Sequence, residues 1–208
     1  MKTKKVLTLC LTAGLVAGML ALPAEAKKKK PKPVASTLYL EGVSNFGEED
    51  QTGTGTYLKL QNAAGSGEKS MGFFNGVASP NTKCAGNSLM PVFVGSVSGQ
   101  IVGDMKISFN TLGTPGKAQV RVWPDVAGQA CNDAYIEPAA SVDVDLPAGK
   151  GLVEAVLEDV NFQAGSLMMV QVTPILGAPA YYSRVLYGTE DSKVEFSCIP
   201  ASGKTCTP

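Results

Sequence analysis

The stretch Met105-Lys106-Ile107-Ser108-Phe109-Asn110 decides the fold class, because apolar and polar side chains alternate along it. Alternation with a period of two is the pattern of a β-strand that buries one face and exposes the other. The same alternation returns in residues 119–122, 141–146 and 194–197. We therefore predict half-buried antiparallel strands in all four segments.

Seven further segments also have the composition of strands, namely residues 36–41, 57–61, 71–75, 91–94, 152–160, 167–173 and 184–187. Residues 152–160 are the segment that comes nearest to a helix, because they contain Glu and Ala, which favour helix. Their three valines and the strand-like segments on both sides favour a strand. Turn sequences such as Gly113-Thr114-Pro115-Gly116 separate the segments. Many short strands about ten residues apart are typical of sandwiches. We predict an all-β fold, an antiparallel jelly-roll β-sandwich over residues 36–208.

The composition excludes several classes of enzyme. The chain has 208 residues, a length that suits one domain, and it contains no histidine. Catalytic sites of the Ser-His-Asp and Cys-His types, histidine general bases and histidine-ligated metals are therefore excluded. We expect a protein that is not an enzyme. A glycoside hydrolase needs only two carboxylates and stays as the alternative; the candidates are Glu41, Glu48, Glu49, Asp50, Asp143, Asp145, Glu190 and Asp191.

The N-terminus has the pattern of a secretory signal peptide in residues 1–26. Lysines come first, an apolar run follows, and Ala24-Glu25-Ala26 forms a small-x-small cleavage sequence. We expect the segment to be removed, so that no membrane span is retained and the protein is secreted or associated with the cell surface.

Residues 27–35 then form a basic arm, which we expect to be disordered because five of its residues are lysines. From Pro33 onward the chain has 10 basic and 17 acidic residues, a net charge of −7. Such an arm could attract anionic surfaces such as teichoic acids of the cell wall, phospholipid or nucleic acid, and the attraction would weaken with salt. The alternative is a flexible spacer.

Four cysteines remain after the signal peptide: Cys84, Cys131, Cys198 and Cys206. An even number in an exported chain predicts two disulfides. We favour Cys198–Cys206, because the short segment between them, with Pro200 and Gly203, can fold back on itself. That choice leaves Cys84–Cys131. The chain-entropy model gives about 2.5 kcal/mol for the short loop and about 4 kcal/mol for the long one.

Exposed aromatic rings could bind carbohydrate by stacking. The candidates are Trp123, Tyr135, Tyr181 and Tyr182. Trp123 is in phase with Gln119 and Arg121 on the outward face of its strand, which predicts that its ring is exposed. The alternative is that these rings pack in the core at the ends of the sandwich.

A structural calcium ion is the one cofactor that the sequence indicates. Glu48, Glu49 and Asp50 lie in a glycine-rich loop, and calcium binds carboxylate and backbone oxygens of such loops. Acidic loops are also commonly just solvated. For partners we expect a cell-wall polymer or carbohydrate, no specific nucleic acid, and a monomeric protein.

Several stretches together carry a resemblance: Cys84-Ala85-Gly86-Asn87, PVFVG at 91–95, SGQIVGD at 98–104, VRVWPDV at 120–126, Cys131-Asn132-Asp133-Ala134-Tyr135 and the Cys198 to Cys206 tail. They are similar to uncharacterised exported β-sandwich proteins of Gram-positive bacteria. More distantly, residues 91–126 resemble the non-catalytic jelly-roll domain, of the galactose-binding-like group, at the end of X-Pro dipeptidyl peptidase-type hydrolases. Those hydrolases keep their catalytic residues in another domain, so the resemblance implies a fold and no catalytic residue. It also fits pairing of Cys84 with Cys131.

Overall fold

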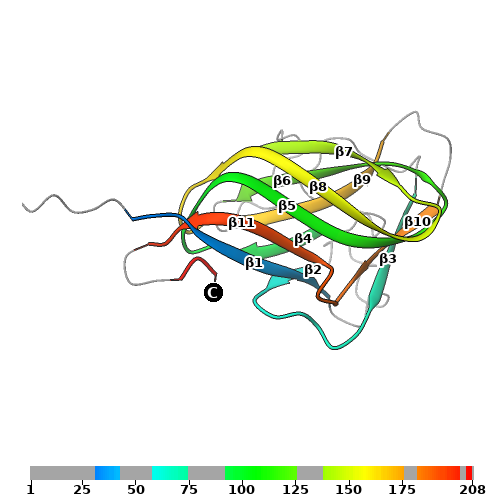
Figure 1. The fold of residues 1–208 in the computed structure, drawn as a ribbon, viewed down its shortest axis with the longest axis horizontal. Helices are drawn as coiled ribbons and strands as arrows, with labels where there is room; N and C mark the ends of the chain where they lie inside the picture. The colour runs from blue at the N-terminus through cyan, green and yellow to red at the C-terminus, as the bar shows by residue number, and fades with distance from the viewer. Residues whose placement is uncertain are drawn as a thin grey trace, which may run out of the picture. The chain divides into compact units, whose positions relative to one another are not determined.

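The described part of the protein is built from β-strands joined by turns (Figure 1). The computed structural model describes residues 31–42, 58–74, 92–125, 138–175, 182–201 and 205–207, all within one unit, Pro31–Pro208. The strands are β1 (Val34–Glu41), β2 (Leu58–Gln61), β3 (Lys69–Phe74), β4 (Val92–Ser96), β5 (Gln100–Gly113), β6 (Gly116–Asp125), β7 (Ala140–Leu146), β8 (Gly149–Phe162), β9 (Leu167–Pro174), β10 (Tyr182–Tyr187) and β11 (Lys193–Ile199). No helix in these residues has the length and hydropathy of a membrane span.

The all-β prediction is confirmed, because each of the predicted segments overlaps one of these strands. Residues 152–160 lie inside β8, so the strand interpretation of that segment is correct. Strand β5 is longer than predicted and runs for 14 residues. Along β11 the side chains alternate between buried and half-buried at every position, as a strand with one face on the core requires. The signal-peptide prediction for residues 1–26 falls outside the described residues.

The strands form one large sheet in the order β3-β10-β5-β11-β1-β2-β4-β9-β6-β7, and β8 pairs with β5 off this path. Figure 1 shows β8, β5 and β11 crossing in front of β6 and β9. The pairings are antiparallel except between β2 and β4, where Leu58 pairs with Phe93 in parallel. The prediction of a purely antiparallel sheet is wrong at this point. This parallel pair connects the β1 side of the sheet to the β4–β9 side. A jelly-roll connectivity stays a prediction.

A single apolar cluster fills the space between the strands, and both parts of the sheet contribute to it. Ile107 and Phe109 of β5 are fully buried, and so are Val120 and Val122 of β6. These are the apolar members of the alternating segments that predicted the strands. The polar members, such as Lys106 and Gln119, point to the other face of their strands. The period-two pattern therefore identified the core side of both strands correctly.

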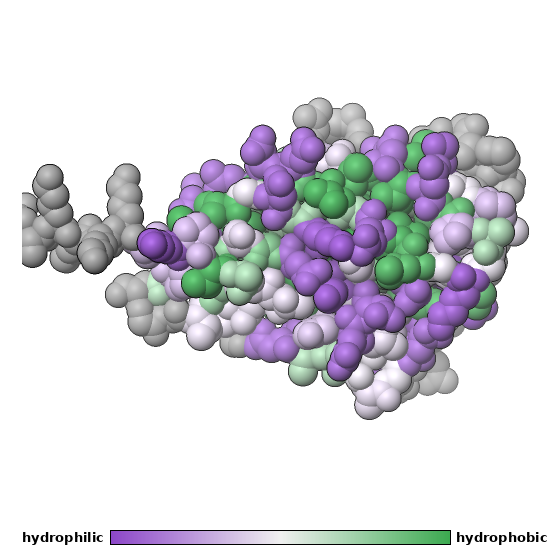
Figure 2. Space-filling model, in the orientation of Figure 1, coloured by the Kyte–Doolittle hydropathy of each residue, from purple (hydrophilic) through white to green (hydrophobic). Residues whose placement is uncertain are grey.

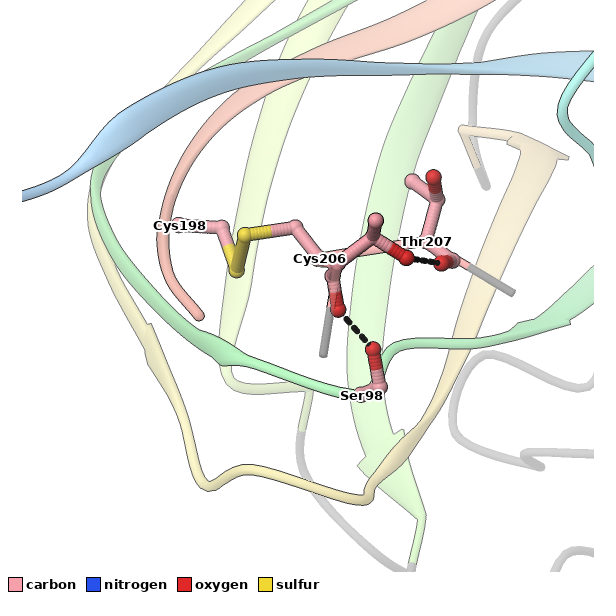
Figure 3. The surroundings of a disulfide bond; sticks show 5 residues. Ser98, Cys198, Cys206 and Thr207 are labelled. Atoms are coloured by element: carbon pink, nitrogen blue, oxygen red, sulfur yellow. Dashed lines mark hydrogen bonds between the residues drawn. A yellow bond between two sulfur atoms is a disulfide. The ribbon is translucent and has the colours of Figure 1, made fainter. Parts of the chain in front are cut away.

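The predicted disulfide Cys198–Cys206 is present, with 6.0 Å between the two Cα atoms (Figure 3). Both cysteines are buried. The Ser98 N–H donates to the carbonyl of Cys206 at 3.1 Å, and the Ser98 hydroxyl donates to the carbonyl of Thr205. The disulfide packs directly on Gly99, where any side chain would overlap the Cys198 sulfur. The bridge thus fastens residues 205–207 to β11, and the Ser98 hydrogen bonds fasten them to the β4–β5 turn. Cys84 and Cys131 lie outside the described residues, so their bridge stays a prediction.

Candidate functional site

Trp123 lies in β6 with 0% of its surface exposed, so the prediction of an exposed stacking ring is wrong for this residue. The phase of the strand was predicted correctly, since Trp123 follows Gln119 and Arg121 on the face opposite Val120 and Val122. That face, however, is itself covered near Trp123. Alternation along a strand identifies the face on which a side chain lies, and it does not reveal whether another part of the chain packs over that face.

The covered face forms a second buried patch outside the main core. Across the strands, Trp123 of β6 pairs with Met169 of β9, and Arg121 pairs with Gln171. Met169 and Gln171 are fully buried, and Arg121 is nearly so. Burial lowers the pKa of the Arg121 guanidinium, and the charge of Asp143 opposes that shift. Neither the nitrogen nor the oxygen of the Gln171 amide has a hydrogen-bond partner among the described residues.

The other predicted site residues are only partly described. Tyr182 is the first residue of β10 and pairs with Phe74 of β3, but its side chain lies outside the described part. Also outside it are the remaining aromatic candidates and the calcium candidates, namely Tyr135, Tyr181, Glu48, Glu49 and Asp50. The described residues therefore do not test a stacking platform of these rings, and these residues stay predictions. Among the described residues, no group of three or more acidic or cysteine side chains is placed to hold a metal ion.

The candidate carboxylates in the described part lie on the surface, apart from Glu41. Asp143 and Asp145 are exposed on the outer face of β7. Asp143 accepts a hydrogen bond from the Gln119 amide at 2.8 Å, and Asp145 pairs with Lys117 at 2.9 Å. The bond to Asp145 raises the pKa of Lys117. Both carboxylates are thus engaged by neighbours on β6. The other two described candidates, Glu190 and Asp191, are exposed in the turn between β10 and β11.

Glu41 is different, because it is a buried carboxylate at the end of β1. Its side chain is 9% exposed and forms an ion pair with Lys69, whose side chain is 32% exposed. Glu41 Oε1 accepts hydrogen bonds from the Lys69 ammonium and, at 2.8 Å, from the Gly42 N–H. Lys69 also donates to the Gly42 carbonyl at 2.9 Å. The end of β1 is therefore fastened to the start of β3.

The second Glu41 oxygen and Tyr187 complete this cluster. Glu41 Oε2 is buried and has no hydrogen-bond partner among the described residues. It lies against the Cα of Gly65, where any side chain would overlap it. Tyr187 is also buried, and its ring meets Phe93 edge to face at 5.6 Å between centroids. Burial raises the pKa of the Tyr187 hydroxyl, and the charge of Glu41 adds to the rise.

This Glu41–Lys69–Tyr187 cluster joins strands that are far apart in the sequence. Because Lys69 supplies the positive charge next to Glu41, the carboxylate is already paired, as buried charges must be. The arrangement therefore suits a fastening role between β1, β3 and β10 rather than cation binding. Sequence reasoning named Glu41 only as one of several acidic residues and missed Lys69 and Tyr187. Period-two alternation did not predict that Glu41 is buried. Leu38 and Leu40 face the core, so alternation places Glu41, the next residue, on the opposite face of β1.

Comparison with solved structures relates the fold to a part of longer proteins. A CocE/NonD family hydrolase from Staphylococcus aureus matches with a TM-score of 0.55 and 11% sequence identity, over 81% of this chain and 37% of that chain. An aminopeptidase from a marine sediment Thaumarchaeota archaeon matches with a TM-score of 0.54 and 13% identity, over 80% of this chain and 37% of the other. No known family model and no curated protein matches the chain significantly.

At these identities the similarity concerns the fold. The chain spans little more than a third of the length of the proteins it matches. This share is consistent with the C-terminal β-sandwich domain of such hydrolases, the kind of domain that the sequence pattern resembled. The β-fold of the described residues is therefore one that occurs as a part of larger hydrolase chains.

Proposed function

We propose that the chain is an exported, non-catalytic β-sandwich module that binds an anionic cell-wall polymer through its basic arm. The separation of charge along the sequence is the observation that carries the proposal. Five lysines lie in residues 27–32, whereas the chain from Pro33 onward has a net charge of −7. A cluster of like charges beside an acidic body attracts polyanions at the arm and repels them elsewhere.

The described residues support polymer binding by the arm rather than sugar binding by the aromatic rings at positions 123 and 187. Pro31 and Lys32 are exposed, and β1 begins two residues later at Val34. Val34 and Ala35, which the sequence assigned to the arm, are part of β1, so the arm ends at Pro33 and is joined directly to that strand. Trp123 and Tyr187 are buried, so neither ring is available to a sugar. Binding through the remaining aromatic candidates, Tyr135, Tyr181 and Tyr182, is the competing proposal.

Retention of the secreted chain on cell-wall material and on a neutral polysaccharide tests the proposal at two salt concentrations. The screening length falls from about 10 Å at 0.1 M salt to about 3 Å at 1 M, so binding by the arm should be strong in the first buffer and lost in the second. Replacing the five arm lysines by serine should abolish retention. Replacing them by arginine keeps the charge and should preserve retention.

Salt-resistant retention on the neutral polysaccharide, unchanged in the serine variant, would refute the arm and favour the aromatic residues. Absence of retention on both materials would refute binding to either polymer and leave a structural role.

A further inference from the structure

The outer face of β8 and β5 exposes an unusual number of large apolar side chains. Leu112 is 43% exposed, Leu152 53% and Val156 50%. Only one other large apolar side chain in the described residues is comparably exposed, Val34 of β1. Leu152 and Leu112 are diagonal neighbours, because Leu152 pairs with Asn110 and Leu112 lies two residues further along β5. Val156 lies on the same face of β8, four residues beyond Leu152. Figure 2 shows apolar patches among hydrophilic side chains on the viewed surface.

The charged side chains of this face already have partners within it. Lys106 pairs with Glu154 at 2.5 Å between nitrogen and oxygen, and Lys150 pairs with Glu68 at 2.6 Å. The bond to Glu154 raises the pKa of Lys106. A surface that covered these residues would not have to supply opposite charges for each of them, which lowers the penalty of removing the face from water.

The order of charges along β8 makes the face complementary to itself. Lys150 and Glu154 lie two residues to either side of Leu152, and all three point to the same side of the strand. Consider a two-fold axis that lies in the plane between the two faces and runs perpendicular to β8 at Leu152. This axis reverses the direction of β8 in the second copy, so each Lys150 lies opposite the other copy's Glu154. It places the two Leu152 side chains together at the centre. An axis along β8 would instead oppose like charges. Self-complementarity about one axis is what a symmetric dimer requires.

We propose that two copies of this chain associate face to face through β8 and β5, with the two-fold axis at Leu152. The contact takes in residues 149–155 of β8, centred on Leu152 and about 23 Å long, and β8, β5, β10 and β3 together are about 19 Å wide. It includes Leu152 and Leu112 and ends one residue before Val156. The footprint is then on the order of 400–500 Å² per copy. Standard interfaces cover about 800 Å² per partner, so the dimer is weak and dissociates on dilution. The proposal therefore differs from the expectation of a monomer in that it predicts a dimer at high concentration. The proposal does not depend on the proposed binding to cell-wall polymer.

Sedimentation velocity of the secreted chain over a range of concentrations tests this proposal. The average mass should rise toward that of two copies as concentration increases. Leu152→Ser should raise the dissociation constant at least tenfold, and Val34→Ser, an equally exposed site outside the face, should leave it unchanged. Both sites are half-exposed, so neither change should alter the thermal unfolding temperature appreciably.

A charge-swap experiment tests the predicted register. Lys150→Glu alone opposes two glutamates and Glu154→Lys alone opposes two lysines, so each should weaken association. The double variant K150E/E154K restores opposite charges across the axis, although each new side chain meets a like charge, Glu68 or Lys106, within its own copy. It should therefore associate more tightly than either single variant. A chain that stays monomeric at every concentration, a dimer indifferent to Leu152→Ser, or a double variant no better than the singles would each overturn the proposal.

Discussion

Replacing Lys69 by methionine should destabilise the protein more than replacing both members of the Glu41–Lys69 pair. Without the ammonium, Glu41 Oε1 keeps only the bond from the Gly42 N–H, and Oε2 has no partner among the described residues. Breaking a fully buried ion pair costs about 3–5 kcal/mol, because the remaining charge is uncompensated. Lys69 is about one-third exposed, so we expect a smaller loss than for a fully buried pair, about 2–3 kcal/mol.

Urea unfolding of a double-mutant cycle measures this difference. The three variants are Lys69→Met, Glu41→Leu and the double replacement, and the double variant should be more stable than Lys69→Met alone. For a protein of this size about 2–3 kcal/mol corresponds to a fall in Tm of about 4–12 °C. The cycle isolates the coupling between the two side chains from their separate contributions to packing.

The exposed pair Lys117–Asp145 provides the control. Its side chains are 61% and 83% exposed, so Lys117→Met should leave the unfolding curve unchanged within error. If Lys69→Met were as stable as the original protein, or if the coupling in the cycle were below about 0.5 kcal/mol, the fastening role of the Glu41 cluster would be refuted.

Three further outcomes follow from the geometry. Trp123, the one tryptophan of the chain, is fully buried, so its fluorescence should resist quenching by iodide, and Trp123→Ala should lower the free energy of unfolding by about 3–5 kcal/mol. Replacing Cys198 and Cys206 by serine should lower the free energy of unfolding by about 2.5 kcal/mol. The part of the loss that a reducing agent causes in the original protein through this bridge should be absent in the variant. Burial raises the pKa of Tyr187 above its ordinary value near 10. Its contribution to stability is therefore present below pH 10 and lost as pH rises through the folded-state pKa. Unfolding measurements should show a steeper loss above pH 10 for the original protein than for Tyr187→Phe, and equal slopes would contradict burial of the hydroxyl.

The fold was readable from the sequence because its signal is local. In Met105–Asn110 each apolar residue that predicted the inward face is buried, and the sequence separation of 8 between Cys198 and Cys206 was short enough to predict their bridge. The long strands were underestimated, since β5 continues through Gly103, where a glycine with φ of +82° and a shift in register against β8 interrupt the alternation. Such a bulge changes the pattern without ending the strand.

The sites were less readable because they depend on which strands become neighbours. Trp123 was predicted on the correct face of β6, but its burial depends on what lies over that face. Glu41 and Lys69 are 28 residues apart and meet only because β10 pairs with β3 while β1 pairs with β11. No local spacing predicts that meeting. The apolar residues of β8 were recognisable as strand residues, yet only the burial along the folded strand shows that Leu152 and Val156 lie on its exposed face.

The two proposals place their interactions on different parts of the molecule, so both can occur in one molecule at the same time. The arm is followed by β1, whose first residue, Val34, pairs with Cys198 of the disulfide. The proposed dimer is centred on Leu152, in the N-terminal half of β8. A dimer would carry two basic arms, and linking two binding elements raises the apparent affinity for a polymer that offers many sites. The weak interface would then make capture depend on how densely the protein accumulates, because a small footprint yields a dimer only at high local concentration. Neutral arms would abolish capture and leave association intact, whereas loss of the Leu152 contact would leave each arm able to bind alone.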